Sequence, residues 1–179
     1  MISKKLALLL GTIAIGATIV SYVHAKKSRS SLIGTQAPDF IISNATGKPQ
    51  KLSDLKGKKI ALCFYPRDNS PFCTKQLCSV RNGIHDLEKK NILIIGISTD
   101  SAEKHAQFKK EQSLPFLLVS DPDKKIARMY KATGGLFGLL KRMTVLIDET
   151  GTIVNVINNV SITDHAQQIM NGFNTTKKR

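Results

Sequence analysis

Two cysteines five residues apart, Cys73 and Cys78, are the side chains of this sequence best suited to redox chemistry. Ser70 is a good helix N-cap, and Pro71 suits the first helical position because it lacks an N–H and its φ is preset. These signals place Cys73 in the first turn of a helix, where free backbone N–H groups and the positive dipole end favour a thiolate. The stretch therefore predicts a cysteine that can attack an electrophilic oxygen.

The spacing to Cys78 sets a condition on any disulfide between the two residues. On an unbroken helix their Cα atoms lie roughly 8–9 Å apart, whereas bridged cysteines have Cα atoms within about 7 Å. A Cys73–Cys78 bond therefore needs local unwinding, which indicates a transient disulfide that follows oxidation of Cys73 to a sulfenic acid. Taken on the helix alone, two small buried side chains are an equally good interpretation.

The sequence argues against a structural disulfide and against a zinc site. Cys63 lies in the middle of an apolar run, so a buried thiol is expected there. An odd, small number of cysteines argues against a disulfide-stapled scaffold. The sequence has no Cys-x-x-Cys pair, and the spacing from Cys78 to His85 fits no common zinc pattern. Neither a metal nor a cofactor is expected.

Strands and helices alternate along the chain around these residues. Strands are expected at 59–65, 91–98, 115–119, 143–147 and 152–157, and helices at 71–90, 101–112, 122–131 and 164–173. Asp121 and Thr163 are the expected N-caps of the last two helices. The order of elements predicts an α/β protein. A thioredoxin-like sandwich fits it, with a central mixed sheet flanked by helices on both faces.

The domain organisation follows from length and composition. A chain of 179 residues suffices for one domain with a sizeable core. We expect a signal peptide or membrane anchor at 1–25, a linker at 26–33, the thioredoxin-like domain at 34–173 and a basic tail at 174–179. The apolar segment 134–140 inside this domain is expected to pack on the core. A dimer contact and a membrane contact are the alternatives for it.

The N-terminal segment predicts a membrane-inserting apolar helix. Residues 6–23 carry no charge, and this length lies between a signal-peptide core and a membrane-spanning helix. Val23 and Ala25 suit a cleavage site, but basic residues follow at once. An uncleaved anchor is favoured over a cleaved signal. A bacterial inner-membrane or periplasmic location is therefore expected, and a domain facing the cytoplasm stays open.

The net charge of +14 raises the question of an acidic partner. Nucleic-acid binding would need a basic stripe with interleaved aromatics, whereas aromatic residues make up 6% of the chain and Trp is absent. Nucleic acid is therefore not an expected partner. Basic residues cluster near both ends, at 26–29 and 177–179. A solvated basic surface is the main interpretation, and attraction to anionic lipid is the alternative.

The motif around the first cysteine resembles a known family. Pro66, Ser70 and Cys73 reproduce the peroxiredoxin signature of Pro, three residues, Thr or Ser, two residues and Cys. Three further segments resemble that family: GTQAPDF at 34–40, LPFLLVSD at 114–121 and RMTVLID at 142–148. The resemblance extends from residue 34 to about residue 160. The Cys73–Cys78 spacing is that of the Q-type subgroup, the bacterioferritin comigratory proteins.

The resemblance implies a role for each residue of the motif. Cys73 would be the peroxidatic cysteine and Cys78 the resolving cysteine. The Ser70 hydroxyl would bind the peroxide, and Pro66 would shield the thiolate from water. Arg142 would lie beside the sulfur and stabilise its negative charge. The implied partners are a hydroperoxide substrate and thioredoxin or another dithiol reductant. A monomer or a weak homodimer is expected.

The main rival is a membrane-tethered thiol–disulfide oxidoreductase of the thioredoxin type. Such proteins use a Cys-x-x-Cys motif, which is absent, and carry a Pro where this chain has Arg142, Met143 and Thr144. A thioredoxin-like binding module without redox activity would have lost the Cys, Ser or Arg of the motif, and all three are present. The sequence therefore favours a thiol peroxidase.

Overall fold

The computed structural model describes residues 32–42 and 49–175. Its centre is a five-stranded sheet in the order β5-β4-β3-β6-β7. The strands are β3 (Lys59–Phe64), β4 (Ile92–Ser98), β5 (Leu117–Ser120), β6 (Met143–Ile147) and β7 (Ile153–Ile157). β3, β4 and β5 run parallel, while β6 pairs antiparallel with β3 and β7 pairs antiparallel with β6. The expected mixed sheet is confirmed.

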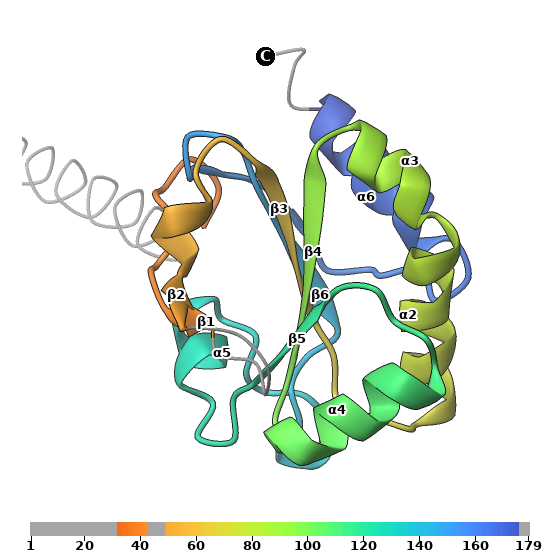
Figure 1. The fold of residues 1–179 in the computed structure, drawn as a ribbon. Coiled ribbons are helices and arrows are strands. Elements are labelled where there is room, and N and C mark those ends of the chain that lie inside the picture. Colours follow the sequence, from red (N-terminus) through yellow and green to blue (C-terminus); the bar gives the residue numbers. More distant parts are fainter. Residues whose placement is uncertain (1–31, 43–48, 176–179) are drawn as a thin grey trace, which may run out of the picture. The chain divides into compact units, whose positions relative to one another are not determined.

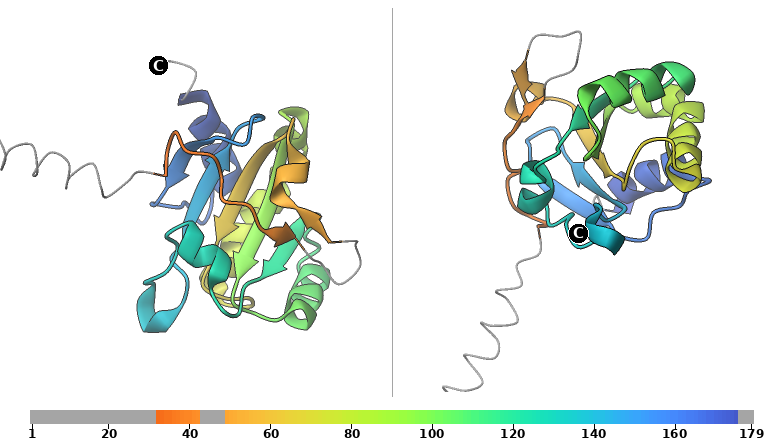
Figure 2. Two further views of the ribbon diagram at one scale, coloured as in Figure 1. Left: turned by 90° about the vertical axis from the view of Figure 1, so that its left-hand side faces the viewer. Right: turned by 90° about the horizontal axis from the view of Figure 1, so that it is seen from below.

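Helices cover both faces of this sheet (Figure 1). One face carries α2 (Pro71–Asn82), α3 (Ile84–Lys89), α4 (Ala102–Glu111) and α6 (His165–Asn174). The other carries α5 (Lys125–Met129), the 3₁₀ turn η1 (Leu52–Leu55) and a short hairpin of β1 (Ile41–Ile42) and β2 (Gln50–Lys51). Figure 2 shows α5 and the segment before β1 on the opposite side of the sheet from α4 and α6. This arrangement is the thioredoxin-like sandwich that the sequence predicts.

Two buried apolar clusters lie on the two faces of the sheet. Side chains alternate along a strand, so β3 sends Cys63 into the cluster under α2 and Phe64 into the cluster under α5. Cys73 belongs to the same cluster as Cys63. The start of α2 is therefore packed on the sheet, and this packing fixes Cys73 relative to β3 and β6.

Helix boundaries differ from the expectations at three places. The helix expected at 71–90 is divided into α2 and α3 at Gly83, where a Cβ would lie 2.4 Å from the Cβ of Ala166 in α6. The helix expected at 122–131 begins only at Lys125, after an N-cap in the left-handed region. Asp121 is not that N-cap, although its carboxylate accepts from the N–H groups of Ile126 and Ala127.

The last helix also starts one residue later than expected. α6 begins at His165 with Asp164 at the N-cap position, so the assignment of Thr163 as N-cap is wrong. Asp164 makes no side-chain capping bond. The first N–H of α6 is instead satisfied from outside, because the backbone N–H of His165 donates to the Ser79 hydroxyl in α2 at 3.1 Å. Contact between two helices thus replaces the local cap.

The apolar segment at 134–140 is only partly buried. Leu140 is 1% exposed, but Leu136 and Phe137 are 77% and 93% exposed, so the expectation of core packing is wrong for the tip of this loop. The tip forms the short 3₁₀ turn η2 (Leu136–Gly138).

The expected N-terminal apolar helix lies outside the described residues, and its role as anchor or signal stays a prediction. Within residues 32–42 and 49–175, every helix is too short or too polar to cross a bilayer.

Candidate active site

Cys73 occupies the third position of α2, in the first turn as expected. Ser70 is the N-cap residue with extended backbone angles, φ −76° and ψ 142°, and Pro71 opens the helix. Cys73 has no exposed surface. Cys73 therefore lies in the first turn of a helix, where the helix dipole favours a negative charge, and it is shielded from bulk water.

Arg142 supplies a positive charge to the Cys73 sulfur. Its Nη2 donates a hydrogen bond to Cys73 Sγ at 3.3 Å. The residue directly precedes β6, whose Met143 pairs with Phe64 near the point where β3 leads into α2. The antiparallel register of β3 and β6 therefore brings together two residues that are 69 positions apart in sequence. Charge-assisted hydrogen bonds of this kind stabilise an anionic sulfur.

The Ser70 hydroxyl does not cap the helix. It makes no capping bond and donates to the carbonyl of Arg67 at 3.4 Å. The expected N-cap position is thus correct, while the expected capping bond is missing. Pro66 lies half-buried directly after β3 and Tyr65.

The loop from Pro66 to Ser70 is held by a buried carboxylate. The backbone N–H of Asp68 donates to Asp100 at 2.8 Å, and its own carboxylate lies 2.7 Å from His105 Nδ1. The Tyr65 hydroxyl donates to the same carboxylate at 2.8 Å. Burial and the nearby Asp68 charge raise the pKa of Tyr65, so the hydroxyl stays protonated and remains the donor. These bonds fix the chain between β3 and the first turn of α2.

Cys78 is on a different side of α2 from Cys73. Five residues of an α-helix correspond to roughly 140° of rotation about its axis, and α2 is continuous across both positions. The half-buried Cys78 thiol donates to Gln112 Oε1 at 3.6 Å, at the end of α4. Arg81 Nη1 donates to the Gln112 carbonyl at 2.7 Å in the same contact. All three cysteines of the sequence, which the structure describes, carry free thiols.

Cys63 is the buried thiol that the sequence predicts. It has no exposed surface, and burial raises its pKa to about 12, although a hydrogen bond from the Thr144 hydroxyl opposes that rise. Thr144 is its direct partner across the β3–β6 pair. Cys63 therefore stays protonated at neutral pH and is a poor nucleophile.

Comparison with known proteins places this geometry in a family. Residues 33–156 match the profile described as the AhpC/TSA family. The chain is 38% identical over 144 residues to a putative peroxiredoxin Bcp of Haemophilus influenzae, and the match covers 77% of this chain and 93% of the relative. A Bacillus subtilis peroxiredoxin Bcp is also 38% identical, with 77% and 92% covered. This chain belongs to the AhpC/TSA family, among its Bcp, or Q-type, peroxiredoxins.

Solved structures agree with this assignment. The fold is similar to that of peroxidoxin BcpB from Mycobacterium tuberculosis, with a TM-score of 0.71, 30% identity, and 80% of this chain and 96% of that chain covered. It is also similar to the bacterioferritin comigratory protein of Xanthomonas campestris, with a TM-score of 0.71, 25% identity, and 78% and 91% covered.

A polar network that the motif does not reveal lies behind Arg142 in this peroxiredoxin. Arg142 Nη1 donates to Gln76 Oε1, and Gln76 Nε2 lies 3.3 Å from His165 Nδ1. His165 Nε2 lies 2.9 Å from the Thr144 hydroxyl oxygen. Gln76, Thr144 and His165 have no exposed surface. One signal for Gln76 was available, because it is a polar residue on the buried face of α2, three residues after Cys73.

His165 is held as a neutral ring by its surroundings. Burial lowers its pKa from 6.5 to about 4, and the positive charge of Arg142 adds to that effect. Between these two values the unfolded chain binds a proton at His165 that the folded protein does not bind. The free energy of unfolding therefore rises with pH across this window, and the contribution is lost as the pH falls from about 6.5 towards 4.

This shift predicts a pH-dependent difference between the wild type and His165→Asn, because asparagine does not titrate. From pH 4 to pH 6.5 the stability of the wild type relative to the variant should increase by up to about 3 kcal/mol and then level off. Urea unfolding of both proteins at a series of pH values measures this difference. A difference that does not change with pH would contradict the neutral state of His165.

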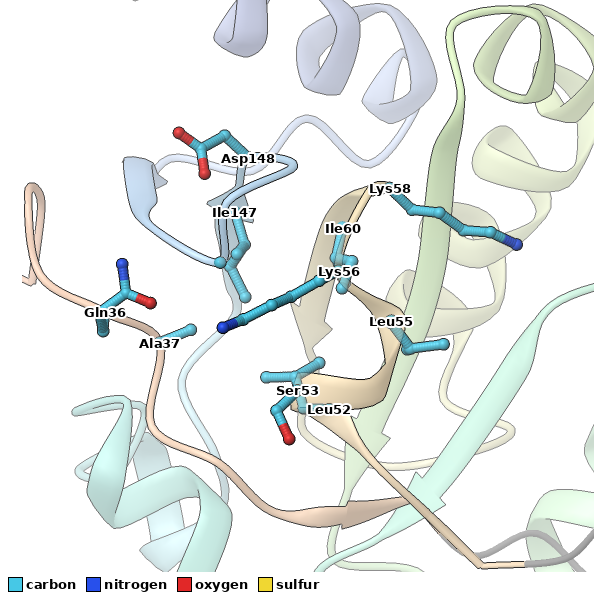
Figure 3. Close-up of a pocket in the computed structure, with 11 residues that line it drawn as sticks. Gln36, Ala37, Leu52, Ser53, Leu55, Lys56, Lys58, Ile60, Ile147 and Asp148 are labelled. Carbon is cyan, nitrogen blue, oxygen red and sulfur yellow. The ribbon is translucent and has the colours of Figure 1, made fainter.

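A surface pocket elsewhere in the molecule does not contain the site. It lies between the segment before β1, η1 and the β6–β7 turn (Figure 3). Lys56 extends across it towards Ala37, and Asp148 lies at its edge. Neither Cys73 nor Arg142 lines this pocket. This pocket therefore lies apart from the start of α2, where Cys73 is placed.

Proposed function

We propose that this peroxiredoxin is a thiol peroxidase in which Cys73 reduces hydrogen peroxide and organic hydroperoxides. The observation that supports it most directly is the hydrogen bond from Arg142 Nη2 to the Cys73 sulfur in the first turn of α2. The relatives support the reaction class, because they are named peroxiredoxins and the Xanthomonas campestris structure is described in terms of alkyl peroxide reduction. Burial and a raised pKa make Cys63 a poorer nucleophile than a cysteine in the first turn of a helix.

The first step is the attack of the Cys73 thiolate on the terminal oxygen of the peroxide. The S–O bond forms as the O–O bond breaks, and the leaving alkoxide or hydroxide takes a proton from solvent to become alcohol or water. Cys73 is oxidised to a sulfenic acid, and the peroxide is reduced by two electrons. Arg142 stabilises the sulfur anion before the attack and the negative charge that moves to oxygen during it.

Ser70 and Pro66 complete the site in this proposal. The Ser70 hydroxyl has only a long bond to the Arg67 carbonyl and is not used to cap α2, so it is available to bind a peroxide oxygen. Pro66 follows Tyr65 at the end of β3 and shields the sulfur from water. Because Cys73 has no exposed surface, a peroxide reaches it only when neighbouring groups move aside.

The second step joins the two cysteines of α2. The Cys78 sulfur attacks the Cys73 sulfenic acid, a disulfide forms and water leaves. Because α2 is continuous and the two side chains point in different directions, part of the helix must unwind first. Unwinding also breaks the contact of Cys78 with Gln112. Thioredoxin or another dithiol then reduces the disulfide by thiol–disulfide exchange and is itself oxidised.

The cycle predicts separate effects on oxidation and turnover for Cys78→Ser. The variant should consume the first equivalent of peroxide at close to the wild-type rate, because Cys73 and Arg142 are unchanged. Continuous turnover with thioredoxin, thioredoxin reductase and NADPH should fall by at least roughly 10²-fold, since no disulfide is presented to the reductant. Stopped-flow peroxide consumption and NADPH oxidation measure the two rates.

Cys63→Ser is the control, because it removes another thiol of the chain, one that is buried under α2 and has no part in the proposed cycle. It should turn over like the wild type. Full turnover by Cys78→Ser would show that a single cysteine suffices and would refute the resolving role of Cys78. A loss of the first oxidation in that variant would place the nucleophile at Cys78.

A further inference from the structure

The Arg142 guanidinium decides which atom donates and which accepts in each hydrogen bond of the network formed by Gln76, His165 and Thr144. A guanidinium has donors and no acceptor, so the Gln76 atom that faces Arg142 is the carbonyl oxygen. The amide nitrogen of Gln76 therefore points the other way, to His165 Nδ1 at 3.3 Å. An amide N–H₂ only donates, and Nδ1 of His165 must accept.

The second ring nitrogen of His165 continues the same direction. Since Nδ1 accepts, the proton of the neutral ring is on Nε2, which donates to the Thr144 hydroxyl oxygen at 2.9 Å. Thr144 can then donate its own proton to the Cys63 sulfur, which is the bond that opposes the rise of the Cys63 pKa. One chain of donors and acceptors thus runs from the Arg142 guanidinium through Gln76 and His165 to the Thr144 hydroxyl.

The orientation of the Gln76 amide depends on this arrangement. If His165 presented an N–H at Nδ1, two donors would face each other, and the amide would have to turn over. Its N–H₂ group would then face the Arg142 guanidinium, again donor against donor at a buried position. The contact that directs Arg142 towards Cys73 would be lost.

We propose that His165 is a positioning residue of the peroxidase site: it fixes the Gln76 amide so that its oxygen holds Arg142 against the Cys73 sulfur. The inference rests on the proposed role of Cys73 and extends it to a helix that does not touch the sulfur. The ring itself acts only through Gln76 and Arg142.

Backbone contacts keep the ring in place for this task. The backbone N–H of His165 donates to the Ser79 hydroxyl at 3.1 Å, and that hydroxyl donates to the backbone carbonyl of Gln76 at 3.0 Å. The start of α6 is therefore tied to the same turn of α2 that carries Gln76. The close approach of Gly83 to Ala166 allows the two helices to meet at this point.

Two substitutions by amide residues distinguish the contribution of His165 Nδ1 from that of Nε2. In His165→Asn the side-chain oxygen takes the place of Nδ1 and can still accept from Gln76. In His165→Gln the amide reaches the place of Nε2 and Thr144, and Gln76 loses its acceptor. We expect the single-turnover rate constant of the 179-residue chain with hydrogen peroxide to stay within about threefold of wild type in His165→Asn and to fall about tenfold in His165→Gln, as for one lost hydrogen bond.

A double-mutant cycle tests whether the effect passes through Arg142. In an Arg142→Leu background, His165→Gln should lower the remaining rate by less than about twofold. Equal rates for His165→Asn and His165→Gln would overturn the proposal. An undiminished tenfold effect of His165→Gln in the Arg142→Leu background would overturn it as well, because it would show a general disturbance of the core.

A measurement on the unaltered chain covers the case in which a variant does not fold. Nitrogen-15 NMR of the histidine rings at pH 7 should show His165 neutral, with its proton on Nε2 and an unprotonated Nδ1. A proton on Nδ1 or a doubly protonated ring would refute the inference. This readout needs no peroxidase activity, so a failure of the proposed reaction and a failure of the positioning role give different results.

Discussion

Replacing Cys73 by serine is expected to lower the rate of peroxide reduction by at least roughly 10³-fold, to the background of the buffer. A serine hydroxyl is not ionised at neutral pH, so the charge that Arg142 stabilises in the wild type never forms. The rate is measured by peroxide consumption in a single turnover and again with a thioredoxin recycling system. Cys73→Ser should lower this rate more than Arg142→Leu or His165→Gln does.

Two controls make the Cys73→Ser result interpretable. Cys63→Ser changes another fully buried cysteine of the same cluster and should leave the rate unchanged. Circular dichroism and thermal unfolding show whether each variant keeps the fold. A folded Cys73→Ser protein that reduces peroxide as fast as the wild type would remove Cys73 from the mechanism.

Arg142→Leu should produce the second largest loss, about 10²- to 10³-fold in the rate constant of the first oxidation. That is the usual effect of removing one fixed donor from a developing negative charge. The substitution removes the hydrogen bond to Cys73 Sγ at 3.3 Å and also the partner of Gln76 Oε1. Stopped-flow measurement with one equivalent of peroxide isolates this step from the later disulfide exchange.

Arg142→Lys separates the charge from the geometry of the guanidinium. A lysine keeps the positive charge but cannot direct two parallel donors to Gln76 and Cys73 in the way that a planar fork does. Its rate should therefore lie between those of the wild type and Arg142→Leu. A wild-type rate in Arg142→Leu would show that the helix start alone stabilises the sulfur anion.

The parts of the fold that sequence predicts are those with strong local signals. Apolar runs mark β3, β4 and β6, which lie close to the strands expected at 59–65, 91–98 and 143–147. The Ser70–Pro71 pair fixes the start of α2. The limits of α3, α5 and α6 are less predictable because they depend on contacts between elements. Gly83 ends α2 at the point where α6 approaches it closely, which no local pattern reveals.

The residues of the candidate site also differ in whether the sequence predicts them. Cys73, Ser70 and Pro66 are found from one short motif, and Arg142 from a second one. Gln76 and His165 are not found, because their roles appear only when β6 and α6 are packed against α2. The buried contacts of Asp68 with Tyr65 and His105 are hidden for the same reason, since their partners come from separate elements.

Peroxide is expected to oxidise Cys73 before the other cysteines of the chain. The most direct test treats the reduced Cys78→Ser chain with one equivalent of hydrogen peroxide in the presence of dimedone, which captures sulfenic acids. Peptide mass mapping then identifies the modified cysteine. We expect one dimedone adduct, on Cys73, and an unmodified Cys63. An adduct on Cys63, or consumption of peroxide without any adduct on Cys73, would contradict the role of Cys73 as the residue that attacks peroxide.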